Sequence, residues 1–252
     1  MGDATYLALI VGAVLWGAVA GLLIPRAAYR FSVEPETPWR THCPDRHPIT
    51  GHPITGPAGG WLGRARCAVD GAVYGRSAPA VVATALVCGL LAAGTGARPE
   101  LAVWLLLAPF AVLLAHIDFA VHRLPDVLTL PLAGGAALLL GGAALLPEHA
   151  GSWPTALLGG LALGGSYFVL FLINPRGMGF GDVKLALVVG VVLGWYGWAV
   201  LFAGAFAGLL LGAVYGLGLI LARRADRKSA LPLGPFMICG ALVGVLLGGL
   251  AG

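Results

Sequence analysis

Three aspartates stand at the edges of long apolar runs, where an ionisable side chain is costly unless it is solvated or paired. Asp118 ends one run, Asp126 begins the next, and Asp182 begins a later one after the glycine-rich segment 177–181. Two carboxylates brought together can share one proton, so that one acts as a base toward water and the other as an acid toward a carbonyl oxygen or leaving amine. The sequence therefore carries the groups that aspartyl protease chemistry requires.

The three aspartates differ in their local settings. Asp126 follows a proline and precedes an apolar run, which favours an N-cap role. Asp182 could cap its helix similarly, but three preceding glycines allow unusual backbone angles and close approach of an extended substrate. Asp118 lies at a helix C-terminus, where the macrodipole disfavours an anion, so function explains it better than capping. A salt bridge to His122 or Arg123 is the structural alternative for Asp118.

The composition indicates that these aspartates belong to a membrane protein. The chain has 252 residues, of which 59% are apolar and 10% charged, and its mean hydropathy is +0.91. A soluble domain has about 25% charged residues. The 40 glycines are scattered inside apolar runs, as in closely packed membrane helices, and four cysteines are too few for a disulfide framework. Disordered, fibrous and small secreted proteins are thereby excluded.

The apolar runs predict an all-α, polytopic protein with eight transmembrane helices. A span needs about 20 apolar residues. The stretch 183–222 has about twice that length, and the aromatic turn Gly194-Trp195-Tyr196-Gly197 divides it. The predicted spans are 5–24, 79–96, 101–117, 127–147, 153–174, 183–195, 197–222 and 233–251.

The basic residues predict the orientation. Fourteen of the 15 Lys and Arg residues fall in the segments 25–78, 118–126, 175–184 and 223–232, all on one side, and Arg98 falls on the other. Because basic residues are retained in the cytoplasm, we expect that side to be cytoplasmic and both termini extracytoplasmic. The net charge of +4 then needs no nucleic acid partner. A cleaved signal peptide is the alternative for the first run, although Met1-Gly2-Asp3 lacks a basic residue.

The proline-rich segment 25–78 is predicted to be a compact or partly disordered loop. Residues of the types that bind zinc occur in it, and a tetrahedral site is one interpretation. Neither cysteine has a second cysteine two or three residues away, so a structure without metal is the other interpretation and the one we expect. The possible ligands are His42, Cys43, His47, His52, Cys67 and Asp70.

Four segments together resemble the type IV prepilin peptidase family of G-x-G-D intramembrane aspartyl proteases. Residues 21–30 resemble G-S-F-x-N-V-x-I-Y-R, although Pro25-Arg26 replaces Asn-Val. Residues 117–131 match I-D-x-x-x-x-x-L-P-D-x-L-T-L-P, and residues 179–185 match G-x-G-D-x-K-L. Gly234-Pro235-Phe236 matches the G-P-F that begins the last span of the family.

The resemblance implies that Asp118 and Asp182 are the catalytic pair and that proteolysis needs no cofactor. Gly179, Gly181, Asp126 and Lys184 would bind substrate or support the pair. The family removes a basic leader from pilin-like precursors at the cytoplasmic face of the bacterial inner membrane, before a hydrophobic helix that stays in the bilayer. The implied partners are thus prepilin-type precursors and lipid.

The sequence departs from the family in its cysteines. Two-function members carry two C-x-x-C pairs in the first cytoplasmic loop, whereas here Arg46 and Asp70 stand where the second thiol of each pair would be. A four-thiolate zinc site cannot form, so we expect no zinc. The same departure leaves open whether the chain methylates the new N-terminus with S-adenosylmethionine.

The sequence therefore predicts a first transmembrane helix at 1–24, a cytoplasmic loop at 25–78, and a seven-helix protease core at 79–252. The alternative function is an ion- or proton-coupled transporter with embedded carboxylates, although the two halves show no repeat symmetry. A non-catalytic partner of a pilus or secretion machine is a further alternative, against which the intact aspartates argue.

Overall fold

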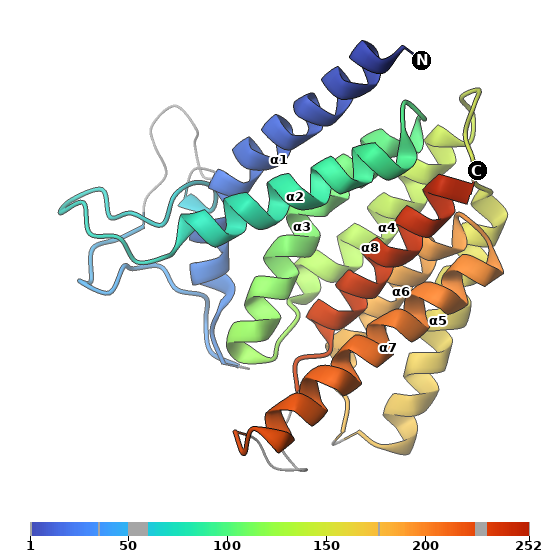
Figure 1. Ribbon diagram of the computed structural model, residues 1–252. Helices are drawn as coiled ribbons and strands as arrows, with labels where there is room; N and C mark the ends of the chain where they lie inside the picture. The colour runs from blue at the N-terminus through green and yellow to red at the C-terminus, as the bar shows by residue number, and fades with distance from the viewer. Residues whose placement is uncertain (1, 35, 50–59, 176, 225–230, 252) are drawn as a thin grey trace.

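The predicted all-α architecture is confirmed. The computed structural model describes residues 2–34, 36–49, 60–175, 177–224 and 231–251, and these form a bundle of eight helices (Figure 1). The helices are α1 (Asp3–Phe31), α2 (Ser77–Thr95), α3 (Glu100–Val121), α4 (Asp126–Ala143), α5 (Trp153–Ile173), α6 (Phe180–Gly194), α7 (Trp198–Leu221) and α8 (Gly234–Ala251).

Seven of these helices are long and apolar enough to cross a membrane, and α6 is the exception. Its 15 residues rise only about 22 Å, against about 30 Å of hydrocarbon. Eleven of the 15 are buried, so neighbouring helices rather than lipid surround α6. The prediction of eight helices is therefore confirmed, with seven of spanning length and one shorter helix, α6, enclosed by its neighbours. The turn predicted at residues 194–197 is confirmed, since α6 ends at Gly194 and α7 begins at Trp198.

Small residues explain how the helices pack so closely. Helices α1 and α2, α5 and α6, and α7 and α8 form the most extensive contacts. A Cβ on Gly17 would lie 2.6 Å from the carbonyl oxygen of Thr84, and one on Gly159 would lie 2.6 Å from that of Gly190. Glycines at these contacts allow helix backbones to approach, as is common between membrane helices.

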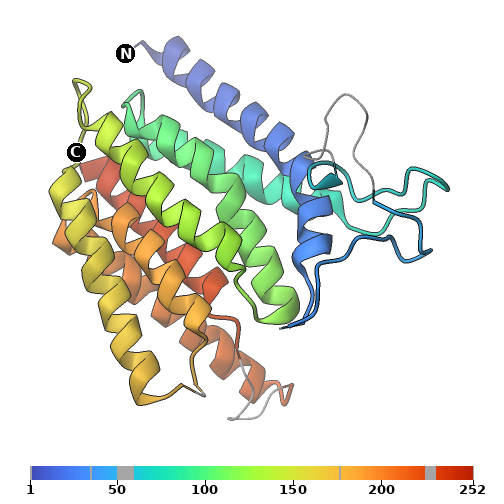
Figure 2. The same ribbon diagram turned by 180° about the vertical axis from the view of Figure 1, so that it is seen from behind.

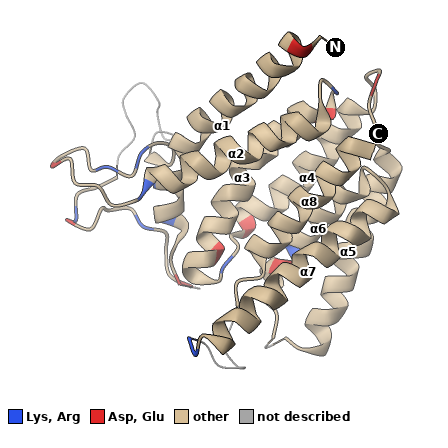
Figure 3. Cartoon of the chain, in the orientation of Figure 1, with Lys and Arg blue, Asp and Glu red and all other residues tan. Residues whose placement is uncertain are grey.

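The loops divide between two ends of the bundle. Both termini lie at one end, and the long loop between α1 and α2 lies at the other, as Figures 1 and 2 show from opposite sides. Figure 3 shows charged residues mainly in loops and near helix ends. Arg98, between α2 and α3, is the one described basic residue at the end that holds the termini. The basic positions 176, 227 and 228 lie outside the described residues.

The first helix is longer than predicted. It continues through Pro25 to Phe31, so the expected boundary at residue 24 falls inside α1. The loop supplies hydrogen bonds to the backbone around the proline: Arg26 N–H donates to the carbonyl oxygen of Gly63 at 3.1 Å, and Gly63 N–H donates to that of Leu23 at 3.0 Å. The loop thus packs directly on the last turns of α1.

Candidate active site

The last turn of α3 carries Asp118, whose side chain is 3% exposed. Its Oδ2 accepts a hydrogen bond at 2.9 Å from the backbone N–H of Gly234, the first residue of α8. The N-terminus of a helix bears a partial positive charge and free N–H groups. The unfavourable position of an anion at the C-terminus of α3 is therefore compensated by the N-terminus of α8.

Asp182 lies in the first turn of α6 and is 9% exposed. Its backbone N–H donates to the carbonyl oxygen of Gly179 at 3.0 Å, and the Gly179 N–H donates to Asp182 Oδ2 at 3.2 Å. These two hydrogen bonds form a capping arrangement at the N-terminus of α6, and they hold the Asp182 carboxylate in place next to that end of the helix. Each of the two aspartates thus accepts one hydrogen bond from a glycine N–H at a helix N-terminus.

The glycines before Asp182 act through their small size and not through unusual backbone angles, contrary to the sequence-based expectation. Gly179 has an ordinary extended conformation, with φ −72° and ψ 144°. A Cβ on Gly181 would lie 3.0 Å from the Cβ of Leu124. Gly181 therefore allows the loop between α3 and α4 to pack against the start of α6, which brings the segments that carry Asp118 and Asp182 together.

Asp118 and Asp182 line one cavity of about 450 Å³ at the end of the bundle that holds the long loop. Its walls come from the α3–α4 loop, the α5–α6 loop and residues 231–233 before α8. Within the described residues, Asp118 makes no ion pair with His122 or Arg123. The Arg123 guanidinium instead donates to the carbonyl oxygen of Glu34 at 3.0 Å. The salt-bridge alternative for Asp118 is therefore not observed.

Asp126 does not cap α4, so the N-cap interpretation is wrong. The N-cap is Pro125, and no side chain caps that end of the helix. Asp126 Oδ1 lies 2.5 Å from Lys184 Nζ, and this ion pair joins α4 to α6. The Lys184 ammonium also lies 4.7 Å from the centroid of the Phe180 ring, a favourable cation–π distance. Both residues thus stabilise the start of α6 next to the cavity.

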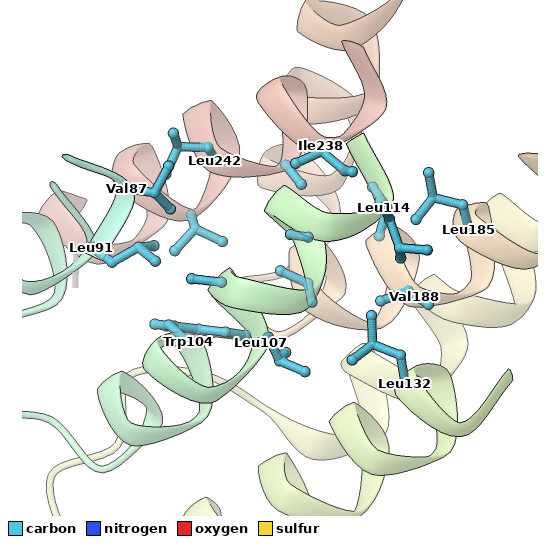
Figure 4. Close-up of a pocket in the computed structure, with 16 residues that line it drawn as sticks. Val87, Leu91, Trp104, Leu107, Leu114, Leu132, Leu185, Val188, Ile238 and Leu242 are labelled. Carbon is cyan, nitrogen blue, oxygen red and sulfur yellow. The ribbon is translucent and has the colours of Figure 1, made fainter. Parts of the chain in front are cut away.

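A second cavity, of about 90 Å³, lies among α2, α3, α4, α6 and α8. Figure 4 shows its 16 lining residues, which are aliphatic apart from Trp104. Its walls offer no carboxylate for proton transfer. The chemistry that the sequence predicts therefore maps to the larger cavity.

One residue at the site was not given a role from the sequence. Gly234 belongs to the G-P-F segment, yet nothing in the sequence relates it to Asp118, which is 116 residues away. A Cβ on Gly234 would lie 2.8 Å from Asp118 Oδ2, so only glycine fits without a shift. The sequence feature that could have drawn attention to Gly234 is its place directly before Pro235 at the start of a predicted helix.

Residues of the long loop form a second cluster of chemically active groups. Cys43 Sγ, Cys67 Sγ and His47 Nδ1 lie within 4.8 Å of one another and could hold a metal ion. His47 Nδ1 is also 3.2 Å from Asp70 Oδ2. The expectation of a metal-free loop is therefore not supported. His42 bonds to Thr41 Oγ1 instead, and His52 lies outside the described residues.

Two tight turns preform this cluster. The Cys43 N–H donates to the carbonyl oxygen of His47 at 2.9 Å, and the Cys67 N–H donates to that of Ala72 at 2.8 Å. The Asp70 side chain accepts the Ala72 N–H at 2.9 Å. That hydrogen bond, together with one to the Cys67 side chain, lowers the pKa of the Asp70 carboxyl. Each turn thus presents one cysteine and one further possible ligand.

The profile of the type IV leader peptidase family matches residues 105–249, which include Asp118, Asp182 and Gly234. A relative named "Prepilin leader peptidase/N-methyltransferase" from Aeromonas salmonicida (strain A449) is 34% identical over 216 residues, 80% of this chain and 70% of the relative. A protein of the same name from Aeromonas hydrophila is 35% identical over 215 residues, with the same coverage.

A third relative of that name, from Pseudomonas aeruginosa, is 31% identical over 192 residues, 73% of this chain and 62% of the relative. No solved structure matches the chain significantly. All three names include N-methyltransferase, so the relatives give no support for setting that activity aside.

Proposed function

The chain belongs to the type IV leader peptidase family, a family of aspartic-type prepilin peptidases, and we propose that Asp118 and Asp182 are its catalytic pair. The observation that carries this proposal is that two buried carboxylates, from the end of α3 and the start of α6, line one cavity. Membership of a peptidase family also argues against the alternative of a transporter.

The chemistry follows from sharing one proton between the two carboxyl groups. The ionised carboxylate takes a proton from water as the water oxygen bonds to the scissile carbonyl carbon. The protonated carboxyl gives its proton to the carbonyl oxygen, which produces a tetrahedral intermediate. When the C–N bond breaks, the leaving nitrogen takes a proton from the first carboxyl group. The second regains its proton from the intermediate, so the pair returns to its starting state.

The neighbouring residues hold this pair in place. The N–H groups of Gly234 and Gly179 each fix one carboxylate oxygen, which leaves the other oxygen of each group for water or substrate. Gly181 sets the spacing between the two segments. The Asp126–Lys184 ion pair holds α4 against α6. The glycine contacts should contribute most to the rate, since small displacements of the reacting groups weaken catalysis, whereas the exposed ion pair should contribute little.

The substrates that we propose are prepilin-type precursors inserted in the bacterial inner membrane. The cavity lies at the same end of the bundle as the long loop, where the basic residues gather. Because basic residues are retained in the cytoplasm, we place this end at the cytoplasmic face and both termini outside. A leader peptide could then enter the cavity from the cytoplasm while its hydrophobic helix remains in lipid.

N-methylation of the new N-terminus is a second activity that we propose, with S-adenosylmethionine as the methyl donor. The support is that the curated relatives are named for both activities. The absence of the second cysteine of each pair does not by itself remove the loop structure, because both turns are formed.

The test is to incubate the purified chain in lipid vesicles with a prepilin-type precursor and to measure the product by mass spectrometry. We expect a cut immediately before the hydrophobic helix, and the mass of one added methyl group when S-adenosylmethionine is present. A known peptidase of the family, incubated with the same precursor preparation, serves as the positive control. If that enzyme cleaves the precursor and this chain leaves it intact, the proposal is contradicted.

A further inference from the structure

Three donors of the loop cluster, from Cys43, His47 and Cys67, lie within 4.8 Å of one another, and Asp70 lies beside His47. Zinc lies about 2.3 Å from sulfur and about 2.0–2.2 Å from nitrogen or oxygen. A regular tetrahedron then separates two sulfurs by about 3.8 Å, sulfur and nitrogen by about 3.6 Å, and nitrogen and oxygen by about 3.4 Å. Three of the six distances among the four donors are 3.6 Å for Cys43 Sγ to Cys67 Sγ, 3.4 Å for Cys67 Sγ to His47 Nδ1, and 3.2 Å for His47 Nδ1 to Asp70 Oδ2.

A disulfide does not fit these distances, whereas hydrogen bonds do, so the choice between a hydrogen-bonded cluster and a metal site depends on which residue types meet. A disulfide has its sulfurs about 2.05 Å apart, and both cysteines are free thiols here. A hydrogen-bonded cluster, however, does not require two thiols and an imidazole to converge from two separate turns, with a carboxylate beside the imidazole. Both cysteines are buried, whereas the side chains of His47 and Asp70 are 35% and 33% exposed, so a metal ion can reach the site from solvent.

We propose that the loop binds one Zn²⁺ through Cys43, His47, Cys67 and Asp70. His47 and Asp70 thereby take the places of the two missing thiolates. In the first turn the donor moves one residue along the chain, from the position of Arg46 to His47. In the second turn Asp70 occupies the position of the missing cysteine itself. A mixed set of two thiolates, one imidazole and one carboxylate is chemically suited to zinc.

The metal would join the two halves of the loop to each other and to α1. Cys43 and Cys67 are 24 residues apart. The second turn continues into a backbone hydrogen bond from Tyr74 N–H to the carbonyl oxygen of Ala65, at 2.9 Å. The Tyr74 ring lies 4.7 Å from that of Tyr29 on α1. This inference does not depend on the proposed peptidase activity, because all of its donors lie outside the aspartate cavity.

The first experiment measures zinc in the full chain, purified in detergent from cells grown with zinc, by elemental analysis. About one zinc per chain is expected. Alkylation should modify Cys43 and Cys67 only after a chelator removes the metal. Zinc far below one per chain, with these two thiols freely alkylated, would overturn the proposal. So would a disulfide, seen as two thiols that appear only after reduction.

The second experiment identifies the donors with matched variants. His47→Gln and Asp70→Asn are compared with His42→Gln and Asp45→Asn, which change the same residue types in the same loop outside the cluster. Loss of even an outer partner of a ligand weakens metal binding roughly 10–100-fold, so the first two variants should lose at least that much zinc affinity and the controls none. Unchanged affinity for Asp70→Asn would overturn its assignment.

Cobalt provides a readout that does not depend on how stable the variants are. Co²⁺ in place of zinc in the unmodified chain should give a tetrahedral spectrum with thiolate charge-transfer bands. The intensity expected is that of two thiolates. A spectrum of octahedral cobalt without thiolate bands would contradict the proposed donor set.

Discussion

Gly234 donates its backbone N–H to Oδ2 of Asp118 at 2.9 Å, which joins the start of α8 to the end of α3. This contact explains how a buried carboxylate is accommodated at the C-terminal end of a helix, since the N-terminus of α8 supplies both a donor and a partial positive charge. The position of Asp118 therefore depends on a segment that is distant in the sequence.

Gly234→Ala should lower the rate of leader cleavage without preventing membrane insertion. The added Cβ would lie 2.8 Å from Asp118 Oδ2 and would displace the carboxylate or its donor. Displacement of a reacting group by about 1 Å can cost roughly 100-fold in rate, so the expected loss is roughly 10–100-fold in kcat. Gly142→Ala is the matched control, because its Cβ would meet nothing within 4 Å. Equal rates for the two variants would contradict this role.

Gly181→Ala should impair cleavage more than Gly179→Ala. A Cβ on Gly181 would lie 3.0 Å from Leu124 and would push the α3–α4 loop away from α6, whereas one on Gly179 would make an ordinary contact of 3.5 Å with Asp182 Oδ2. Displacement of reacting groups by about 1 Å can cost roughly 100-fold in rate. Kinetics on the same precursor would measure both variants, and the opposite ranking would refute the packing explanation.

Asp126→Asn should retain cleavage and lower thermal stability only slightly. Its ion pair with Lys184 joins α4 to α6, but the Asp126 side chain is 63% exposed. Exposed ion pairs contribute about 0–1 kcal/mol. Thermal unfolding in detergent and the cleavage rate would be measured for this variant beside Lys184→Met. A complete loss of cleavage in Asp126→Asn would assign this residue to the reaction itself.

Cysteine labelling tests the orientation. Glu148→Cys lies in the α4–α5 loop, at the end of the bundle that holds the termini, and Arg223→Cys lies just after α7, at the opposite end. An impermeant thiol reagent added outside intact cells should modify the cysteine at 148 and spare that at 223. The parent chain gives the background from its own four cysteines. The reverse pattern would place the aspartate cavity outside the cytoplasm.

Much of the fold could be predicted because membrane helices are encoded locally. Apolar runs gave the number of helices, and the turn at Gly194–Gly197 separated α6 from α7 correctly. The end of α1 was missed because Pro25 usually stops a helix, and the bonds that allow its continuation come from Gly63. Likewise the apolar run 183–195 was predicted as a transmembrane helix like the others, because hydropathy does not report that neighbouring helices enclose α6.

The site could be predicted only in part, for a similar reason. Asp118 and Asp182 stood out because charges are rare in apolar runs. The pairing of Asp126 with Lys184, 2.5 Å apart, depends on tertiary packing of α4 on α6, and capping was the only local role that the sequence offered. The loop ligands were judged by their spacing along the chain, whereas the structure brings together two turns that are distant in sequence.

Cleavage of a prepilin-type precursor by Asp118→Asn and Asp182→Asn proteins tests the central claim most directly. Asparagine preserves the size of each side chain but cannot share a proton, so each variant should insert normally and reach normal abundance while cleavage is abolished. The measurement is the mass of the precursor after incubation with equal amounts of each protein in lipid vesicles. A mature product from either variant at a rate near that of the unmodified chain would contradict the aspartate pair.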